Sequence, residues 1–320
     1  MARRDAAKAG LSAMEATGQT QLSRTDPDAR LLTKNGQTVA GYNAQIAVDE
    51  KHRLIVASDV VNDGNDTGQL HTLALAAKQA LEVQTLQAVA DCGYFNGETL
   101  KACEEDAIET FVAEPQRRRT KAGGRFGLDQ YRYDAASDTY RCPNGATLKP
   151  MASRKTDAAG KRRIPYAILR TACRACPVRT RCLAASAQRR IIERWEHEAV
   201  VERHRARMTK AVTADMMRRR KASAEHPLGT LKCRAGYTHF LVRGFEKVRG
   251  EWSQMVLCYN FTRVLNLIGL KRFTAWLAQH NPCQAHRLPA TSQRTPITLR
   301  AMLQALLPIR NACTIRTCSI

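Results

Sequence analysis

The chain has 320 residues, of which 44% are hydrophobic, enough for one large or two moderate domains with packed cores. No segment approaches the about 18 consecutive apolar residues of a membrane span, and the N-terminus lacks the apolar core of a secretory signal. Eleven cysteines without such a signal indicate a reducing compartment, so the sequence predicts a cytoplasmic protein with thiol or metal-bound cysteines.

The formal net charge of +22 is unevenly distributed along the chain. Residues 26–114 carry six lysines and arginines against fifteen aspartates and glutamates, whereas residues 115–225 carry 28 against ten. A solvated basic surface without chemistry is one interpretation of this pattern. The other is a polyanion-binding segment next to a carboxylate-lined centre, which is typical of an enzyme that acts on nucleic acid.

The first half of the chain predicts alternating strands and helices. Residues 1–20 are small and polar and are expected to be a linker or a disordered end, and residues 21–26 are a possible short strand. Two alternating runs around residues 42–49 and 53–60 predict a hairpin, followed by a helix over 69–82. A strand over 86–90 ends at Asp91, Asn96 is a plausible N-cap of the next helix, and residues 108–112 form another strand. The order predicts a mixed α/β sheet.

The pattern changes in the second half. Residues 115–188 are rich in Arg, Gly and Cys and are expected to form an insertion. A helical pattern resumes near Arg189 and is interrupted at His226, Pro227 and Gly229. Residues 252–270 have the spacing of a core helix, and the tail from residue 273 to residue 320 is expected to be irregular.

Three carboxylates are the main candidates for chemistry. Asp91 stands where a strand ends and a helix begins, which is where open α/β sheets bind ligands. Asp26 could come from a neighbouring strand and Glu225 from the basic helical segment. Converging carboxylates can hold two Mg²⁺ or Mn²⁺ ions that act on a phosphodiester. A single carboxylate in such a position is more often a surface or capping residue. The sequence contains no P-loop, dinucleotide-binding fingerprint or Ser-His-Asp pattern that would favour another chemistry over a metal site.

Five motifs occur in order along residues 22–270: TDPDAR, GYNAQIAVD, NDGND, ADCGYF and AEHPLGTLK. Together they resemble the DDE transposases of bacterial insertion sequences, in particular the subgroup with a cysteine-bearing insertion before the catalytic Glu. The resemblance implies a ribonuclease-H-like catalytic core over residues 21–114 and 189–272, interrupted by the basic insertion at 115–188. Such transposases also carry an N-terminal region that recognises the element ends. This chain is expected to be a truncated copy that lacks that region.

The resemblance assigns roles to particular residues. Asp26, Asp91 and Glu225 take the catalytic, magnesium-binding positions. Asp28 and Asp49 stay open as alternatives for the first of them, and Glu251 is the runner-up for the last. The flanking basic residues of the Glu motif are expected to bind the DNA backbone, and they are Arg220, Lys221 and Lys232.

Four cysteines in CPNG and CRACPVRTRC form a further candidate site, and they are Cys142, Cys173, Cys176 and Cys182. The C-x₂-C pair has zinc-knuckle spacing, and the flanking cysteines bring the thiol count to four. A structural Zn²⁺ would supply folding energy to a polar insertion. Scattered reduced cysteines and, less often, disulfides remain alternatives.

The function expected from these features is metal-dependent cleavage of element ends and strand transfer into target DNA. The expected partners are terminal-repeat and target DNA, with a homodimer in a synaptic complex, no membrane, and a nucleoid-associated location. The alternative is a truncated, non-catalytic DNA-binding remnant that zinc stabilises.

Overall fold

The computed structural model describes residues 2–18, 21–34, 37–115, 125–157, 160–279 and 312–319. They divide into two compact units. The first unit comprises Met1–Glu114 and His204–Ile320, and the second comprises Pro115–Arg203. Each unit is described by itself.

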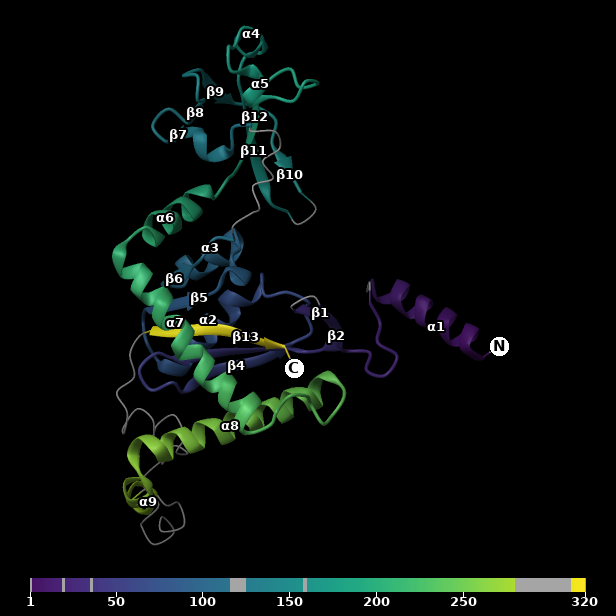
Figure 1. The fold of residues 1–320 in the computed structure, drawn as a ribbon, viewed down its shortest axis with the longest axis vertical. Coiled ribbons are helices and arrows are strands. Elements are labelled where there is room, and N and C mark those ends of the chain that lie inside the picture. Colours follow the sequence, from purple (N-terminus) through teal and green to yellow (C-terminus); the bar gives the residue numbers. More distant parts are fainter. Residues whose placement is uncertain are drawn as a thin grey trace, which may run out of the picture. The chain divides into compact units, whose positions relative to one another are not determined.

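The first unit is built on a five-stranded mixed sheet with the order β4-β3-β13-β5-β6. Its strands are β3 (Asn43–Asp49), β4 (Ile55–Val61), β5 (Leu86–Ala90), β6 (Ile108–Val112) and β13 (Ala312–Ser319). β3 and β4 form the antiparallel hairpin, and β5 and β6 are parallel. The central strand is β13, coloured yellow in Figure 1, which runs antiparallel to β3 and parallel to β5.

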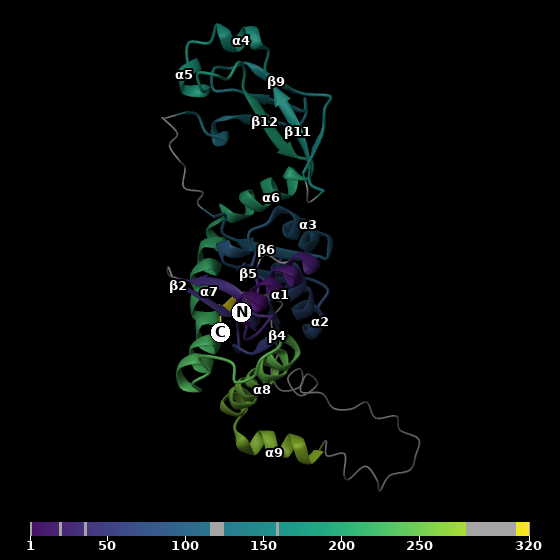
Figure 2. The ribbon, with the colours of Figure 1, turned by 90° about the vertical axis from the view of Figure 1, so that its right-hand side faces the viewer.

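Helices cover both faces of this sheet. Figure 2 shows α7 on one side of the strands, with α2 and α3 on the other. The bounds are α2 (Gln69–Leu81), α3 (Gly97–Glu105), α7 (Ala211–Gly229) and α8 (Phe245–Ile268). All seven residues of β3 are buried, as expected for a strand covered on both faces.

The first unit has several further elements. α1 (Ala2–Thr17) begins the chain, and β1 (Arg30–Lys34) pairs with β2 (Gln37–Gly41) as a separate antiparallel ribbon. A 3₁₀ turn (Cys92–Tyr94) follows β5, a π-helical turn (Thr230–Arg234) follows α7, and α9 (Leu270–Gln279) follows α8. α6 (Glu198–Met208) spans the boundary between the units.

The second unit has a six-stranded antiparallel sheet around an aromatic core. Its strands are β7 (Arg132–Asp134), β8 (Thr139–Arg141), β9 (Thr147–Pro150), β10 (Lys155–Thr156), β11 (Arg162–Ala167) and β12 (Ile191–Trp195). A 3₁₀ turn (Leu128–Gln130) precedes them, and α4 (Arg170–Arg174) and α5 (Arg179–Cys182) lie between β11 and β12. Tyr131, Tyr140 and Tyr166 are all buried in its core.

The predicted mixed α/β architecture is confirmed, as are the hairpin, the strands ending at Ala90 and Val112, and the helices α2, α3 and α8. Asn96 caps α3, since its side chain accepts a hydrogen bond from the backbone N–H of Glu98.

Five details of the prediction are wrong. Residues 2–17 form a helix instead of a linker, and residues 21–26 form no strand. Residues 191–195 form β12 ahead of the resumed helix, because pairing with β11 overrides the local pattern. The tail contains α9 and β13, while residues 280–311 lie outside the described part.

The fifth correction concerns the end of α7. The sequence predicts an interruption at Pro227, but α7 continues to Gly229 with Pro227 inside it. A proline removes one hydrogen-bond donor and crowds the preceding turn, and a π-type turn is one way in which a helix absorbs such an irregularity. The chain forms such a turn directly afterwards, at residues 230–234.

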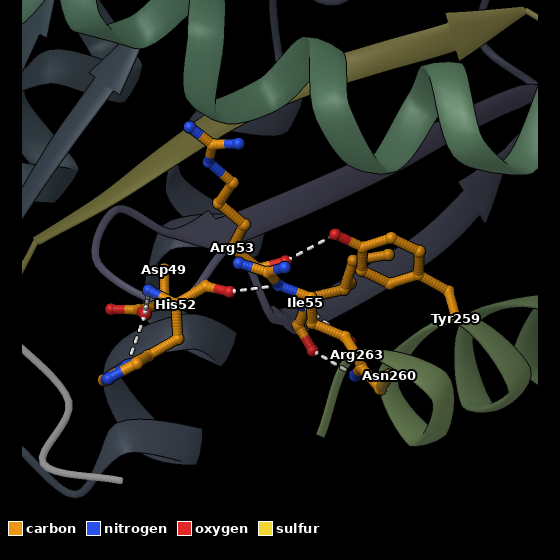
Figure 3. Close-up of polar contacts among 7 residues, drawn as sticks. All are labelled: Asp49, His52, Arg53, Ile55, Tyr259, Asn260 and Arg263. Carbon is orange, nitrogen blue, oxygen red and sulfur yellow. Dashed lines mark hydrogen bonds and ion pairs between the residues drawn. The ribbon is translucent and has the colours of Figure 1, made fainter. Parts of the chain in front are cut away.

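The β3–β4 turn is fixed to α8 by several hydrogen bonds (Figure 3). The buried Asn260 amide accepts from the N–H of Ile55 at 2.9 Å and donates to its carbonyl at 2.8 Å. Tyr259 donates its hydroxyl to the carbonyl of Arg53 at 2.6 Å, and burial raises the pKa of Tyr259 to about 12. Arg263 donates to the carbonyl of His52, so one face of α8 is held to the hairpin.

Candidate active site

Asp91 is placed by the end of β5. Its Oδ1 accepts from the backbone N–H of Gly93 at 3.0 Å, which caps the 3₁₀ turn, and its side chain is 33% exposed. Its Oδ2 lies 3.8 Å from Nη1 of Arg220 on α7. The sequence therefore identified a carboxylate that does sit at the carboxyl end of a parallel strand, facing a cation.

Asp66 is a neighbour of Asp91 that the sequence prediction missed. A Cβ at Gly93 would lie 3.2 Å from Oδ1 of Asp91 and 3.3 Å from Oδ2 of Asp66, so the two carboxylates flank the same point. Asp66 Oδ1 accepts from the side-chain amides of Asn43 at 2.7 Å and Gln45 at 3.2 Å. The only signal in the sequence is the last Asp of the NDGND motif, which precedes α2.

The predicted DNA-binding residues lie on α7 and the turn after it. The Arg220 side chain is 21% exposed, and its Nε and Nη1 are buried without a hydrogen-bond acceptor among the described residues. The side chain of Lys221 lies outside the described part of the structure. Lys232 is half-buried in the π-helical turn.

Asp26 and Asp28 hold the start of α8. Asp26 is 8% exposed, and its Oδ2 accepts from the Tyr42 hydroxyl at 2.8 Å and from the N–H of Gly244 at 3.3 Å. Asp28 Oδ2 accepts from the N–H of Phe245 at 3.0 Å. Backbone N–H groups at a helix start need acceptors and favour negative charge, so these contacts are those of a cap.

The predicted triad of Asp26, Asp91 and Glu225 is not gathered into one cluster. Glu225 is exposed on α7, whereas the neighbouring Ser223 and Pro227 are buried. Glu225 follows Arg220 by five residues and therefore points to a different side of the helix. Within the described residues, no group of three or more His, Cys, Asp or Glu side chains is arranged to hold a metal ion.

Asp49, the second alternative for the first ligand, is fully buried in the β3–β4 turn. Its Oδ2 accepts from the backbone N–H of His52 at 2.6 Å and lies 3.1 Å from the imidazole Nδ1 (Figure 3). These contacts stabilise the turn at the opposite end of β3 from Asn43 and Asp66.

The four predicted zinc ligands share one small cavity in the second unit. Cys142, Cys173, Cys176 and Cys182 all line a cavity of about 30 Å³. The Tyr131 hydroxyl and the Cys182 thiol are hydrogen-bonded at 2.9 Å, and burial is the main cause that raises the pKa of Tyr131. The fold thus brings together cysteines that come from a strand end, from two short helices and from the turn between those helices.

A second, larger hollow lies at the other end of the first unit's parallel strands. It has a volume of about 1040 Å³ and is lined by the starts of β5 and β6 and by residues of α6 and α7, including Phe111, Arg207 and Arg219. Asp91 does not line it, because β5 has its carboxyl end on the opposite side. This pocket therefore does not mark the position of the carboxylates.

Comparison with known families gives one match. Residues 141–265 are similar to the family model described as the transposase DDE domain. The matched segment contains Glu225, Arg220 and the four cysteines, but it begins after Asp91 and Asp66. No curated protein and no solved structure matches the chain. Among the described residues, no helix is both long and apolar enough to cross a membrane.

Proposed function

We propose that this chain is a DNA transposase of a bacterial insertion sequence. The observation that carries the proposal is the similarity of residues 141–265 to the transposase DDE domain. The position of Asp91 supports it, because a partly exposed carboxylate stands at the end of β5, an inner parallel strand of the sheet. A ribonuclease-H-like core is the fold we propose, supported by an antiparallel hairpin beside a parallel pair of strands, with helices on both faces.

The residues around Asp91 suit a hard divalent cation. Mg²⁺ binds oxygen ligands and is commonly held by one or two carboxylates together with water and substrate phosphate. Asp91 provides such an oxygen. The family motifs offer Glu225 and Asp26 as its partners, and we propose them as such although this structure does not gather the three carboxylates into one cluster. When bound, Mg²⁺ or Mn²⁺ would lower the pKa of an attacking water or 3′-hydroxyl and offset charge on the phosphate.

The chain's own groups have separate tasks in this proposal. Asp91 is held by the N–H of Gly93, so its carboxylate is oriented before any ligand arrives. Arg220 brings a positive charge to the same place, where a DNA phosphate would enter. Lys221 and Lys232 would bind the adjacent phosphates of the DNA backbone without contributing sequence specificity. In this proposal a homodimer binds the terminal-repeat and target DNA in the cytoplasm.

The test is cleavage of a plasmid that carries the DNA flanking the coding region. The wild-type protein should nick this DNA with Mg²⁺, and Asp91→Asn should abolish nicking while electrophoretic mobility shifts on the same DNA stay unchanged. Asp63→Asn, an exposed aspartate in the turn before α2, is the matched control and should retain activity. Equal nicking by Asp91→Asn and wild type would refute the catalytic role.

A second candidate function is DNA binding without strand cleavage. It is favoured by the exposed position of Glu225, which no described carboxylate cluster includes. In that case neither the wild type nor any variant would nick DNA, and binding would depend on salt through the basic residues alone.

We also propose a structural Zn²⁺ at the four-cysteine cavity. Two tight turns support it: the N–H of Gly145 bonds to the carbonyl of Cys142, and the N–H of Cys176 bonds to that of Cys173. A volume of about 30 Å³ suits a single ion or water. The four thiols are not arranged to hold a metal ion in this structure, so the proposal includes a rotation of the cysteine side chains toward the cavity. Arg179 and Arg190 also line it and would offset the charge of four thiolates.

The zinc proposal is tested by metal analysis of protein purified under reducing conditions. One zinc per chain is expected, with loss of the metal and of second-unit stability in Cys173→Ser. The control is Cys258→Ser, because Cys258 is an exposed cysteine of α8 outside the cavity, and this variant should retain its zinc. Full metal content in Cys173→Ser, or none in the wild type, would overturn the proposal.

A further inference from the structure

Asp66 and Asp91 come from different elements but meet at one point. Asp66 stands in the turn before α2, and Asp91 follows β5. Gly93 lies between them, and the position its Cβ would occupy is 3.2 Å from one carboxylate oxygen and 3.3 Å from the other. The two oxygens are therefore no farther apart than the sum of those distances, and a side-chain rotation that brings them to within about 4–5 Å of each other would let one cation bind both.

The Asp66 carboxylate is fixed by a buried polar network. Asn43 and Gln45 are 4% and 1% exposed, and their side chains lie on the same face of β3 because they are two residues apart. Both donate to Asp66 Oδ1, and the Tyr94 hydroxyl in turn donates to the Gln45 side chain. Such support holds Asp66 in one position, as a metal ligand requires.

A second observation points to a cation at this place. The side-chain oxygen of Asn43, on the same amide that donates to Asp66, is buried and has no donor among the described groups. A buried oxygen without a donor is an uncommon cost in a folded protein, and a cation or its bound water satisfies such an oxygen. Two carboxylates and an amide oxygen are the hard ligands that Mg²⁺ and Mn²⁺ prefer.

We propose that Asp66 is, with Asp91, a direct ligand of the divalent cation at the proposed transposase centre. The inference rests on the proposed function and adds a residue that the family motifs did not supply. Arg220, 3.8 Å from Asp91, then lies on the phosphate side of the pair and limits the net negative charge of the site. Gly93 is the position that lets the two carboxylates approach each other.

The first test measures Mn²⁺ binding by electron paramagnetic resonance on the full chain. Asp66→Asn keeps the size of the side chain and an acceptor for Asn43, but removes the charge, and should weaken Mn²⁺ binding at least tenfold. Asp91→Asn should do the same. Asp63→Asn, in the same turn, is the matched control and should bind as the wild type does. Asp66→Glu restores the charge and should recover part of the affinity, which a purely structural role would not predict.

The second test needs no variant and therefore does not depend on a mutant folding. Fe²⁺ with ascorbate and peroxide cuts a backbone near the bound metal, so the wild-type chain should be cut near residue 66 and near residue 91, and excess Mg²⁺ should protect both. Two outcomes would overturn the role of Asp66 and leave the proposed function standing. One is cleavage of the chain near residue 91 alone, and the other is a Mn²⁺ affinity that is unchanged in Asp66→Asn but lost in Asp91→Asn. Unchanged Mn²⁺ binding and DNA nicking in Asp91→Asn would overturn both.

Discussion

Replacing Asp26 by Asn tests whether this residue caps α8 or serves as a metal ligand. Asp26 is 8% exposed and accepts from the Tyr42 hydroxyl at 2.8 Å and the Gly244 N–H at 3.3 Å. Asn keeps the shape of the side chain and one oxygen acceptor, so the substitution removes mainly the charge. We expect a local loss of stability at the start of α8.

The magnitude follows from the two contacts. A hydrogen bond to a charged group contributes about 1.5–3 kcal/mol and a neutral one about half as much, so the Tyr42 contact should lose about 1 kcal/mol. A negative charge at a helix N-terminus contributes about 0.3–1 kcal/mol. The total is about 2 kcal/mol, which corresponds to roughly 30-fold in an equilibrium constant.

Amide hydrogen exchange is the assay, because it reports the opening of individual segments. The amides of Gly244 and Phe245 should exchange about 30-fold faster in Asp26→Asn. Tyr42→Phe, which removes the hydroxyl donor and leaves the carboxylate, should give a similar acceleration, while β11 of the second unit should exchange unchanged. Wild-type exchange at Gly244 in both variants would refute the capping role. Weakened Mn²⁺ binding with unchanged exchange would instead make Asp26 a metal ligand.

Three further predictions concern other parts of the first unit. Gly93→Ala places a methyl group against the carboxylates of Asp66 and Asp91 and should weaken Mn²⁺ binding several-fold, with little change in the thermal midpoint of unfolding. Tighter Mn²⁺ binding would contradict this geometry. Asn260→Ala leaves the N–H and carbonyl of Ile55 without partners and should lower the free energy of unfolding, measured in urea, by about 2–4 kcal/mol. A decrease below about 0.5 kcal/mol would show that water replaces the amide. Burial is the main cause that lowers the pKa of His204, and nearby arginine charges add to it, so the unfolded chain binds the proton more readily and stability should fall as the pH drops below about 6.5. The fall in thermal midpoint between pH 8 and pH 5 should be smaller in His204→Gln than in the wild type.

Much of the first unit could be predicted from local patterns. The alternation in residues 43–61 and the apolar runs ending at Ala90 and Val112 are strong signals, because a half-buried or buried strand needs those residues wherever it pairs. The cap at Asn96 is equally local. The linker prediction for residues 2–17 failed because small polar residues are compatible with both a helix and a coil.

The candidate site was only half visible in the sequence. Asp91 could be identified because the end of a strand and the start of a helix are both local features. Asp66 could not, because its turn meets Asp91 only after β3, β5 and α2 have packed. The capping contact of Asp26 joins residues 218 positions apart, and no local pattern encodes it.

The sequence by itself determined the class of fold, the charge division, the four-cysteine group and the carboxylate at the end of β5. These depend on side-chain type and short-range spacing, which the folded chain preserves. Only the tertiary structure decided which groups meet. It made β13 the central strand, directed Asp26 and Asp28 to the start of α8, and left Glu225 on the exposed side of α7. It also brought Asp66 to Asp91, because contacts between distant segments follow from the packing of whole elements around a shared core.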